Sequence, residues 1–237
     1  MYRSVIMCTL VVVCFTFSLY TTGRQTAHAS SGRVDLIVYT DTTVPPFYGG
    51  HSLPSSGSKV TVTALVTLQN NNICKSCTYL WKKDGTLQNG VTDTPDATFS
   101  FTPKFETRVV IGVEVRDSSG ALVASNAQVL PIMKPELYFY EQNPLQGLLF
   151  RTLSNKYLFI GEEITLRAYP YFINSSIEQK DLLTAWSING REVQTVENPY
   201  LITLRKEDLR DKTQLTFSVR NLKALLQGVE KSITIRL

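Results

Sequence analysis

The chain has few of the residues that most often carry catalysis and metal binding. Its 237 residues include 2 histidines, of which only His51 lies outside residues 1–29. No serine occupies a G-x-S-x-G elbow. The adjacent carboxylates Glu162-Glu163 and Glu207-Asp208 point to opposite sides of a strand, so neither makes a natural acid–base pair. The sequence therefore predicts no catalytic residue, no cofactor and no enzyme.

The chain also has only one long apolar run. This run extends from Val5 to Leu19, about 15 residues, whereas a membrane-spanning helix needs roughly 20. Arg3 precedes this run, and Ala27-His-Ala29 forms an A-x-A cleavage site after it. We therefore expect 1–29 to be a signal peptide and the product to be secreted, periplasmic or on the cell surface. The alternative is an uncleaved N-terminal membrane anchor.

The chain has no strong excess of charge of either sign. Loss of Arg3 and Arg24 with the predicted signal lowers the formal net charge from +4 to +2, because residues 1–29 contain no acid. Proteins that bind nucleic acids or membrane surfaces are usually much more basic. We expect no nucleic-acid partner, and membrane contact only through an uncleaved N-terminal segment.

Cysteine is scarce as well. Cys8 and Cys14 lie in the predicted signal, which leaves Cys74 and Cys77 in Cys-Lys-Ser-Cys. Three interpretations are open: a local disulfide, which export permits; a redox pair, which requires a helix N-terminus where this sequence predicts a strand; and half of a zinc site, which lacks a second pair of ligands.

The chain does contain an internal repeat. Trp81-Lys-Lys-Asp84-Gly85 returns as Trp186-Ser-Ile-Asn189-Gly190 at an offset of 105 residues, and Val60 to Leu65 returns at 104. Leu36-Ile-Val-Tyr39 resembles Leu137-Tyr-Phe-Tyr140 at 101. Apolar residues alternate with polar ones throughout, as in half-buried strands. Asp-Gly and Asn-Gly favour tight hairpins after each tryptophan.

These patterns predict an all-β protein with two tandem sandwiches of about 100 residues each. We place the first domain at 33–132 and the second at 135–237. The junction 129–138, which runs from the last strand of one repeat into the first of the next, contains Pro131 and Pro135 and is therefore semi-rigid. Residues 207–212 favour a short helical turn.

The tryptophan hairpins and the Val113-x-Val115-x-Asp117-x-x-Gly120 pattern resemble the immunoglobulin-like and PKD-like domains of bacterial envelope proteins. The resemblance implies adhesion, spacing or scaffold roles. It supplies no binding residue, because these folds bind through variable loops. The cysteine pair that joins the two sheets of antibody domains is absent here.

Several side chains are candidate site residues. Trp81 and Trp186 could line a glycan site, but their position on central strands favours core packing. Tyr138 and Tyr140 alternate with Leu137 and Phe139, so one of these pairs must face away from the core. An outward tyrosine pair would be the best candidate interaction surface. Four aspartates could bind calcium at a domain end, although no Asp-x-Asp spacing supports this: Asp41, Asp93, Asp96 and Asp117.

The sequence thus predicts a non-enzymatic envelope protein that contacts a protein partner, as an adhesion or scaffold module. The alternative is a carbohydrate-binding module that uses exposed aromatic residues of the second domain. A redox enzyme acting through Cys74 and Cys77 is the weakest hypothesis.

Overall fold

The protein is described by a computed structural model that covers residues 32–44, 48–68, 74, 76–88, 97–174, 181–195 and 198–237. Residues 31–237 form one compact unit. The predicted signal peptide, with Cys8 and Cys14, lies outside the described residues. Within the described ranges, no helix is long and apolar enough to cross a membrane.

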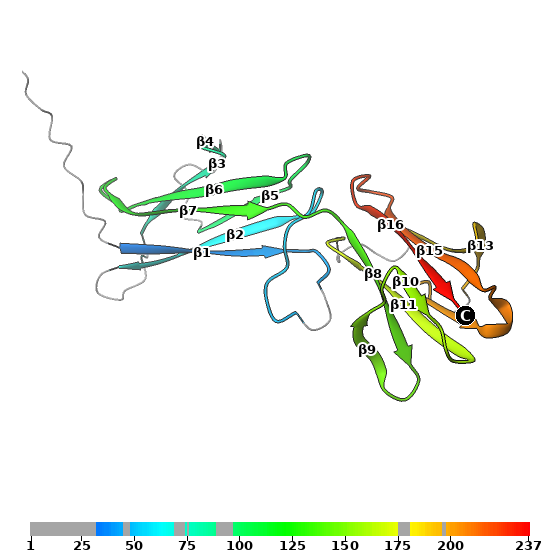
Figure 1. The fold of residues 1–237 in the computed structure, drawn as a ribbon. Helices are drawn as coiled ribbons and strands as arrows, with labels where there is room; N and C mark the ends of the chain where they lie inside the picture. The colour runs from blue at the N-terminus through cyan, green and yellow to red at the C-terminus, as the bar shows by residue number, and fades with distance from the viewer. Residues whose placement is uncertain are drawn as a thin grey trace, which may run out of the picture. The chain divides into compact units, whose positions relative to one another are not determined.

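The first sandwich consists of two antiparallel sheets (Figure 1). One sheet has the order β1-β2-β5 and the other the order β4-β3-β6-β7. The seven strands are β1 (Gly32–Thr40), β2 (Val60–Leu68), β3 (Thr78–Lys83), β4 (Thr86–Leu87), β5 (Thr98–Phe101), β6 (Arg108–Arg116) and β7 (Leu122–Pro131).

The second sandwich pairs a sheet of order β14-β11-β8-β9 with one of order β10-β16-β15-β12-β13. All its strand pairs are antiparallel except β10 with β16. The elements are β8 (Glu136–Asn143), β9 (Gly147–Thr152), β10 (Lys156–Leu158), β11 (Glu163–Tyr171), β12 (Leu182–Ile188), β13 (Arg191–Val193), β14 (Leu201–Arg205), the 3₁₀ helix η2 (Lys206–Asp208), β15 (Lys212–Asn221) and β16 (Gly228–Arg236).

The two sandwiches use the same strand order. β1, β2, β3, β4, β5, β6 and β7 correspond to β8, β11, β12, β13, β14, β15 and β16, and the second sandwich adds β9 and β10. The repeat and the all-β, immunoglobulin-like sandwich architecture expected from the sequence are therefore present. The domain limits 33–132 and 135–237 stay a prediction.

Alternation in the sequence creates the core of each sandwich. In β6, Val109, Ile111, Val113 and Val115 are buried while the intervening residues are not, as expected for side chains that alternate between sheet faces. The buried apolar residues form two separate clusters, one in each sandwich. Burial of this apolar surface is the main contribution that favours folding.

Each cluster is built around its tryptophan. Trp81 is fully buried and stacks on Phe99 with ring centroids 5.6 Å apart. Trp186 lies 4.6 Å from Phe217, and its Nε1 donates to the Pro199 carbonyl over 2.9 Å. Both side chains are therefore enclosed and offer no surface to a glycan.

The turns after the tryptophan strands have the expected conformation. Asp84 and Gly85 have positive φ values of 50° and 79°, and Asn189 and Gly190 have 51° and 79°. Two successive positive φ values define the tight hairpin turn that suits twisted strands. The prediction of a hairpin at both places is confirmed, and η2 provides the short helical turn expected near residue 207.

Hydrogen bonds between loops join the two copies, in addition to the covalent chain. The backbone of Thr43 in the β1–β2 loop accepts from Phe172 N at 3.0 Å and donates to the Ile173 carbonyl at 2.8 Å. In the linking segment, Met133 N donates to the Pro54 carbonyl over 2.7 Å. The link is thus held by hydrogen bonds as well as by its two prolines.

Candidate interaction surfaces

The predicted tyrosine pair lies on the outward face of a sheet. Leu137 and Phe139 of β8 are buried in the core, so Tyr138 and Tyr140 point to the other side. Tyr138 is opposite Tyr169 of β11 in the strand register. The sequence did not decide which of the two pairs faces away from the core, and in the structure it is the pair of tyrosines.

This outward face is nevertheless closed around Tyr140. The Tyr140 side chain is only 7% exposed, and its hydroxyl is hydrogen-bonded to that of Tyr171. The ring of Tyr140 lies edge-on to Tyr169 at 6.3 Å. Burial, followed by the hydrogen bond with Tyr140, raises the pKa of Tyr171 above its usual value. These rings pack on one another and leave little of Tyr140 to a partner.

Tyr138 is half-buried and its polar groups are engaged. Its hydroxyl donates to Glu136 Oε2 over 2.8 Å, and Lys231 Nζ lies 4.4 Å from the ring centroid. The hydrogen bond with Glu136 raises the pKa of Tyr138, and burial lowers the pKa of Lys231. A sugar or protein partner would have to compete with the cation–π contact and with the carboxylate.

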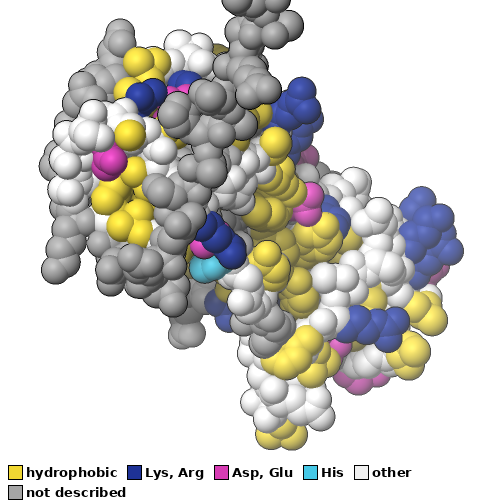
Figure 2. Space-filling view, turned by 90° about the vertical axis from the view of Figure 1, so that its left-hand side faces the viewer, with side chains coloured by type: hydrophobic (Ala, Val, Ile, Leu, Met, Phe, Trp, Pro, Cys, Tyr) yellow, Lys and Arg dark blue, Asp and Glu magenta, His cyan; other side chains and the backbone are white. Residues whose placement is uncertain are grey.

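The matching positions in the first sandwich are open. Ile37 and Tyr39 match Tyr138 and Tyr140 in the sequence repeat at the offset of 101, and they are 43% and 66% exposed. Leu65 of β2, on the same outward face, is exposed too. The repeat offset of 101 residues was the signal that could have identified this pair. Figure 2 shows that hydrophobic side chains form several surface patches among the charged residues.

A hollow adjoins this face at the seam between β1 and β7. The two strands lie close but are not hydrogen-bonded neighbours in a sheet. Asn126 bridges one end of the seam, because its Nδ2 donates to the Val34 carbonyl and its Oδ1 accepts from Ala127 N, both over 2.8 Å. Further along, a hollow of about 230 Å³ is lined by Leu36, Val38, His51, Leu53 and the exposed Val129, among others.

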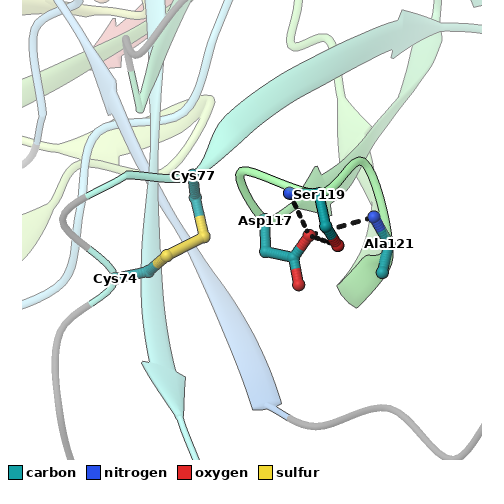
Figure 3. The surroundings of a disulfide bond; sticks show 5 residues. All are labelled: Cys74, Cys77, Asp117, Ser119 and Ala121. Carbon is teal, nitrogen blue, oxygen red and sulfur yellow. Dashed lines mark hydrogen bonds between the residues drawn. A yellow bond between two sulfur atoms is a disulfide. The ribbon is translucent and has the colours of Figure 1, made fainter.

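The cysteine pair forms a disulfide in the structure. Cys74 is bonded to Cys77 immediately before β3. Figure 3 shows this bond beside the β6–β7 turn, where Asp117 Oδ1 accepts from Ser119 N, Ser119 Oγ and Ala121 N. Because residue 78 begins a strand, neither sulfur lies at a helix N-terminus that would activate a thiol. The disulfide therefore fastens the approach to β3.

The remaining candidate residues do not converge on a reactive site. Glu162 and Glu163 pair with Lys206 and Arg205 at 3.5 Å and 3.1 Å. His51 is exposed beside the β1–β7 hollow. Asp117 Oδ1 is occupied by its own turn, and Asp41 Oδ1 accepts from Lys59 N. The part of the chain that the structure describes contains no group of three or more metal-ligating side chains; Asp93 and Asp96 lie outside it.

Comparisons with known proteins add little beyond this geometry. No protein-family model and no curated protein matches the sequence. Among solved structures, the three N-terminal domains of the highly immunogenic outer capsid protein of bacteriophage RB49 are 16% identical, with a TM-score of 0.47, over 86% of this chain and 59% of that one.

Two further similar structures come from distant sources. The fibronectin(III)-like modules of Clostridium thermocellum CbhA are 13% identical over 85% of this chain and 94% of that one, with a TM-score of 0.28. Extracellular domains 3–5 of Drosophila OTK are 12% identical over 83% and 66%, also with a TM-score of 0.28. At these TM-scores the fold assignment rests on the strand order and pairings described above.

Proposed function

We propose that this chain is an exported, non-enzymatic protein that binds a protein partner in the cell envelope, as an adhesion or scaffold module. The observation that carries the proposal is the exposed apolar face of β1 and β2, formed by Ile37, Tyr39 and Leu65. Contiguous exposed apolar surface on a folded protein is typical of an interaction site. The disulfide and the apolar N-terminal segment support a location outside the cytoplasm.

The binding mode that suits this face is the addition of a partner strand. Among the described strands, β7 pairs only with β6, so its other edge is unpaired in the described part of the chain beyond Asn126. An extended segment of the partner would pair with that edge, and its side chains would fill the hollow and pack on Ile37. Backbone pairing supplies affinity in this mode, and the hollow supplies specificity.

The experiment separates binding from folding. Ile37→Ser and Tyr39→Ser should each weaken partner binding by roughly tenfold or more. Both should leave the free energy of unfolding within about 0.5 kcal/mol of the parent value, since the side chains are exposed. Tyr140→Phe, the matched control, should cost about 1 kcal/mol of stability because a buried hydroxyl loses its partner, and should leave binding unchanged.

The partner is first identified by photo-cross-linking in the native envelope. A photoreactive residue at position 39 should give one adduct of defined mass, and the same residue at the exposed position Leu145 should give none. Equal adducts from both positions, or none from position 39, would contradict the proposal. Glycan-array binding that is lost on Tyr138→Ala would instead favour the carbohydrate-binding alternative, which the engaged tyrosines do not support.

A further inference from the structure

A second open surface lies on the other copy, on the outward face of the sheet that contains β16, β15 and β12. A hollow of about 420 Å³ is lined there by the small residues Ala185, Ser218 and Gly228. Exposed Leu183 and Leu225 line it too. In the strand register, Leu183 is opposite Arg220 and Ala185 is opposite Ser218. Small side chains next to protruding leucines give one surface both a depression and a projection.

The β15–β16 hairpin holds its leucines outward. Asn221 and Gln227 are fully buried, and Asn221 Nδ2 donates to Gln227 Oε1 over 2.9 Å. Asn221 Oδ1 accepts from the backbone of Lys223 and Ala224 at 2.8 and 3.2 Å. Leu225, on this fixed turn, is 84% exposed. A leucine held in this way loses little conformational freedom when it is buried by a partner.

Charges of both signs border the same hollow. Arg220 of β15 and Glu230 of β16 line it, and within the described residues neither has an ion-pair partner. A projection, a depression and two opposite charges on one surface are the features that allow it to be complementary to itself. Self-complementarity is what a two-fold symmetric interface requires, since each residue then meets its counterpart twice.

We propose that this surface binds a second copy of the chain about a two-fold axis. Leu225 of each copy enters the hollow of the other, and Arg220 of each copy faces Glu230 of the other. The dimer uses the second sandwich alone. It leaves the Ile37 and Tyr39 face of the first sandwich free for a different protein, so neither proposal depends on the other.

Sedimentation velocity on the purified protein tests the proposal. A monomer–dimer equilibrium that shifts with concentration is expected. Leu225→Ser, Arg220→Glu and Glu230→Arg should each raise the dimer dissociation constant by about tenfold. The combined Arg220→Glu and Glu230→Arg variant should restore dimerisation, because the charge pairs re-form with exchanged signs.

Controls keep the test specific. Leu145→Ser changes an even more exposed leucine of the same sandwich outside the hollow, and should leave the equilibrium unchanged. Far-ultraviolet circular dichroism checks that every variant is folded. A protein that is monomeric at all concentrations, a dimer that ignores the single substitutions, or a double charge variant that stays dissociated would each overturn the proposal.

Discussion

The outward faces of the two sandwiches start from similar strands and differ in exposure. Ile37 and Tyr39 on β1 correspond to Tyr138 and Tyr140 on β8. Tyr39 is largely exposed, whereas Tyr140 is buried and hydrogen-bonded to Tyr171. Similar strands therefore have an exposed outward face in one copy and a packed outward face in the other.

The difference originates on the neighbouring strand. Ile37 and Tyr39 of β1 are opposite Thr63 and Thr61 of β2 in the strand register, whereas Tyr138 and Tyr140 of β8 are opposite Tyr169 and Arg167 of β11. The guanidinium carbon of Arg167 lies 5.6 Å from the Tyr169 ring centroid, and Tyr169 contacts Tyr140 and Tyr171. Long side chains across the strands thus cover the second face. Short threonines leave the first face open.

The first sandwich differs in a further respect, which concerns its carboxyl groups and its disulfide. Among the described residues, the three carboxyl groups with a lowered pKa all lie there: Glu106, Glu114 and Asp117. The disulfide is there as well. The second sandwich has an additional pair of strands, β9 and β10, in place of these. The two copies therefore should respond differently to acid and to reductant.

The largest expected effect concerns the two tryptophans, and it should be the same in both copies. Trp81→Ala and Trp186→Ala should each cost about 3–5 kcal/mol of unfolding free energy, since each leaves a cavity in a closed core. With one tryptophan remaining, fluorescence during chemical denaturation reports on the other sandwich. That sandwich should unfold at its parent midpoint, because the two cores are separate. A shared loss would show that the copies unfold as one unit.

A smaller effect should appear only in the first sandwich. Cys74→Ser and Cys77→Ser, or reduction, should cost at most about 2 kcal/mol, the loop-entropy estimate for four residues. Trp81 fluorescence in a Trp186→Phe background follows this loss. Trp186 in a Trp81→Phe background should not respond. An equal response from both tryptophans would remove the distinction between the copies.

The smallest effect is a difference in acid sensitivity. The hydrogen bond from Lys83 lowers the pKa of Glu106 from 4.5 to about 2. A carboxyl whose pKa is lower in the folded state stabilises the fold above its unfolded pKa, and this contribution is lost as the pH falls through the folded value. Between about pH 4.5 and 2, the first sandwich should lose more stability than the second.

Glu106→Gln tests this assignment. The variant should flatten the acid dependence that Trp81 reports and leave that of Trp186 unchanged. Salt should reduce the effect, since both side chains are partly exposed to solvent. A steeper acid dependence in the second sandwich would contradict the assignment.

The sequence was sufficient for the architecture, because strands, turns and tryptophan cores depend on local patterns. Alternation separates the residues of a strand into two faces, and Asp84-Gly85 and Asn189-Gly190 favour their turns through local residue preference. The exposure of an outward residue depends instead on its cross-strand neighbours, which only the register reveals. For this reason alternation showed that one of the pairs Tyr138/Tyr140 and Leu137/Phe139 faces outward, and could not show that Tyr140 is covered.

The sequence analysis did not identify the surface around Leu225, and the reason is a different one. Leu222, Leu225 and Leu226 fall between two strands, where turn residues are usually polar. Apolar residues in such a turn are not explained by packing in the core, and this could have drawn attention to them. Its significance depends on the buried Asn221–Gln227 pair, which holds the turn in place and which no spacing in the sequence predicts.

The two tryptophan hairpins also differ in chemical durability. Val110 N donates to Asp84 Oδ1 over 2.8 Å, and Gln214 N donates to Asn189 Oδ1 over the same distance. The turn thus requires a side-chain oxygen acceptor and not the amide nitrogen. Conversion of Asn189 to aspartate, one of the products when Asn-Gly ages by loss of ammonia through a cyclic imide, would preserve this bond and add one negative charge. The second hairpin would then have the Asp-Gly turn that the first one already contains.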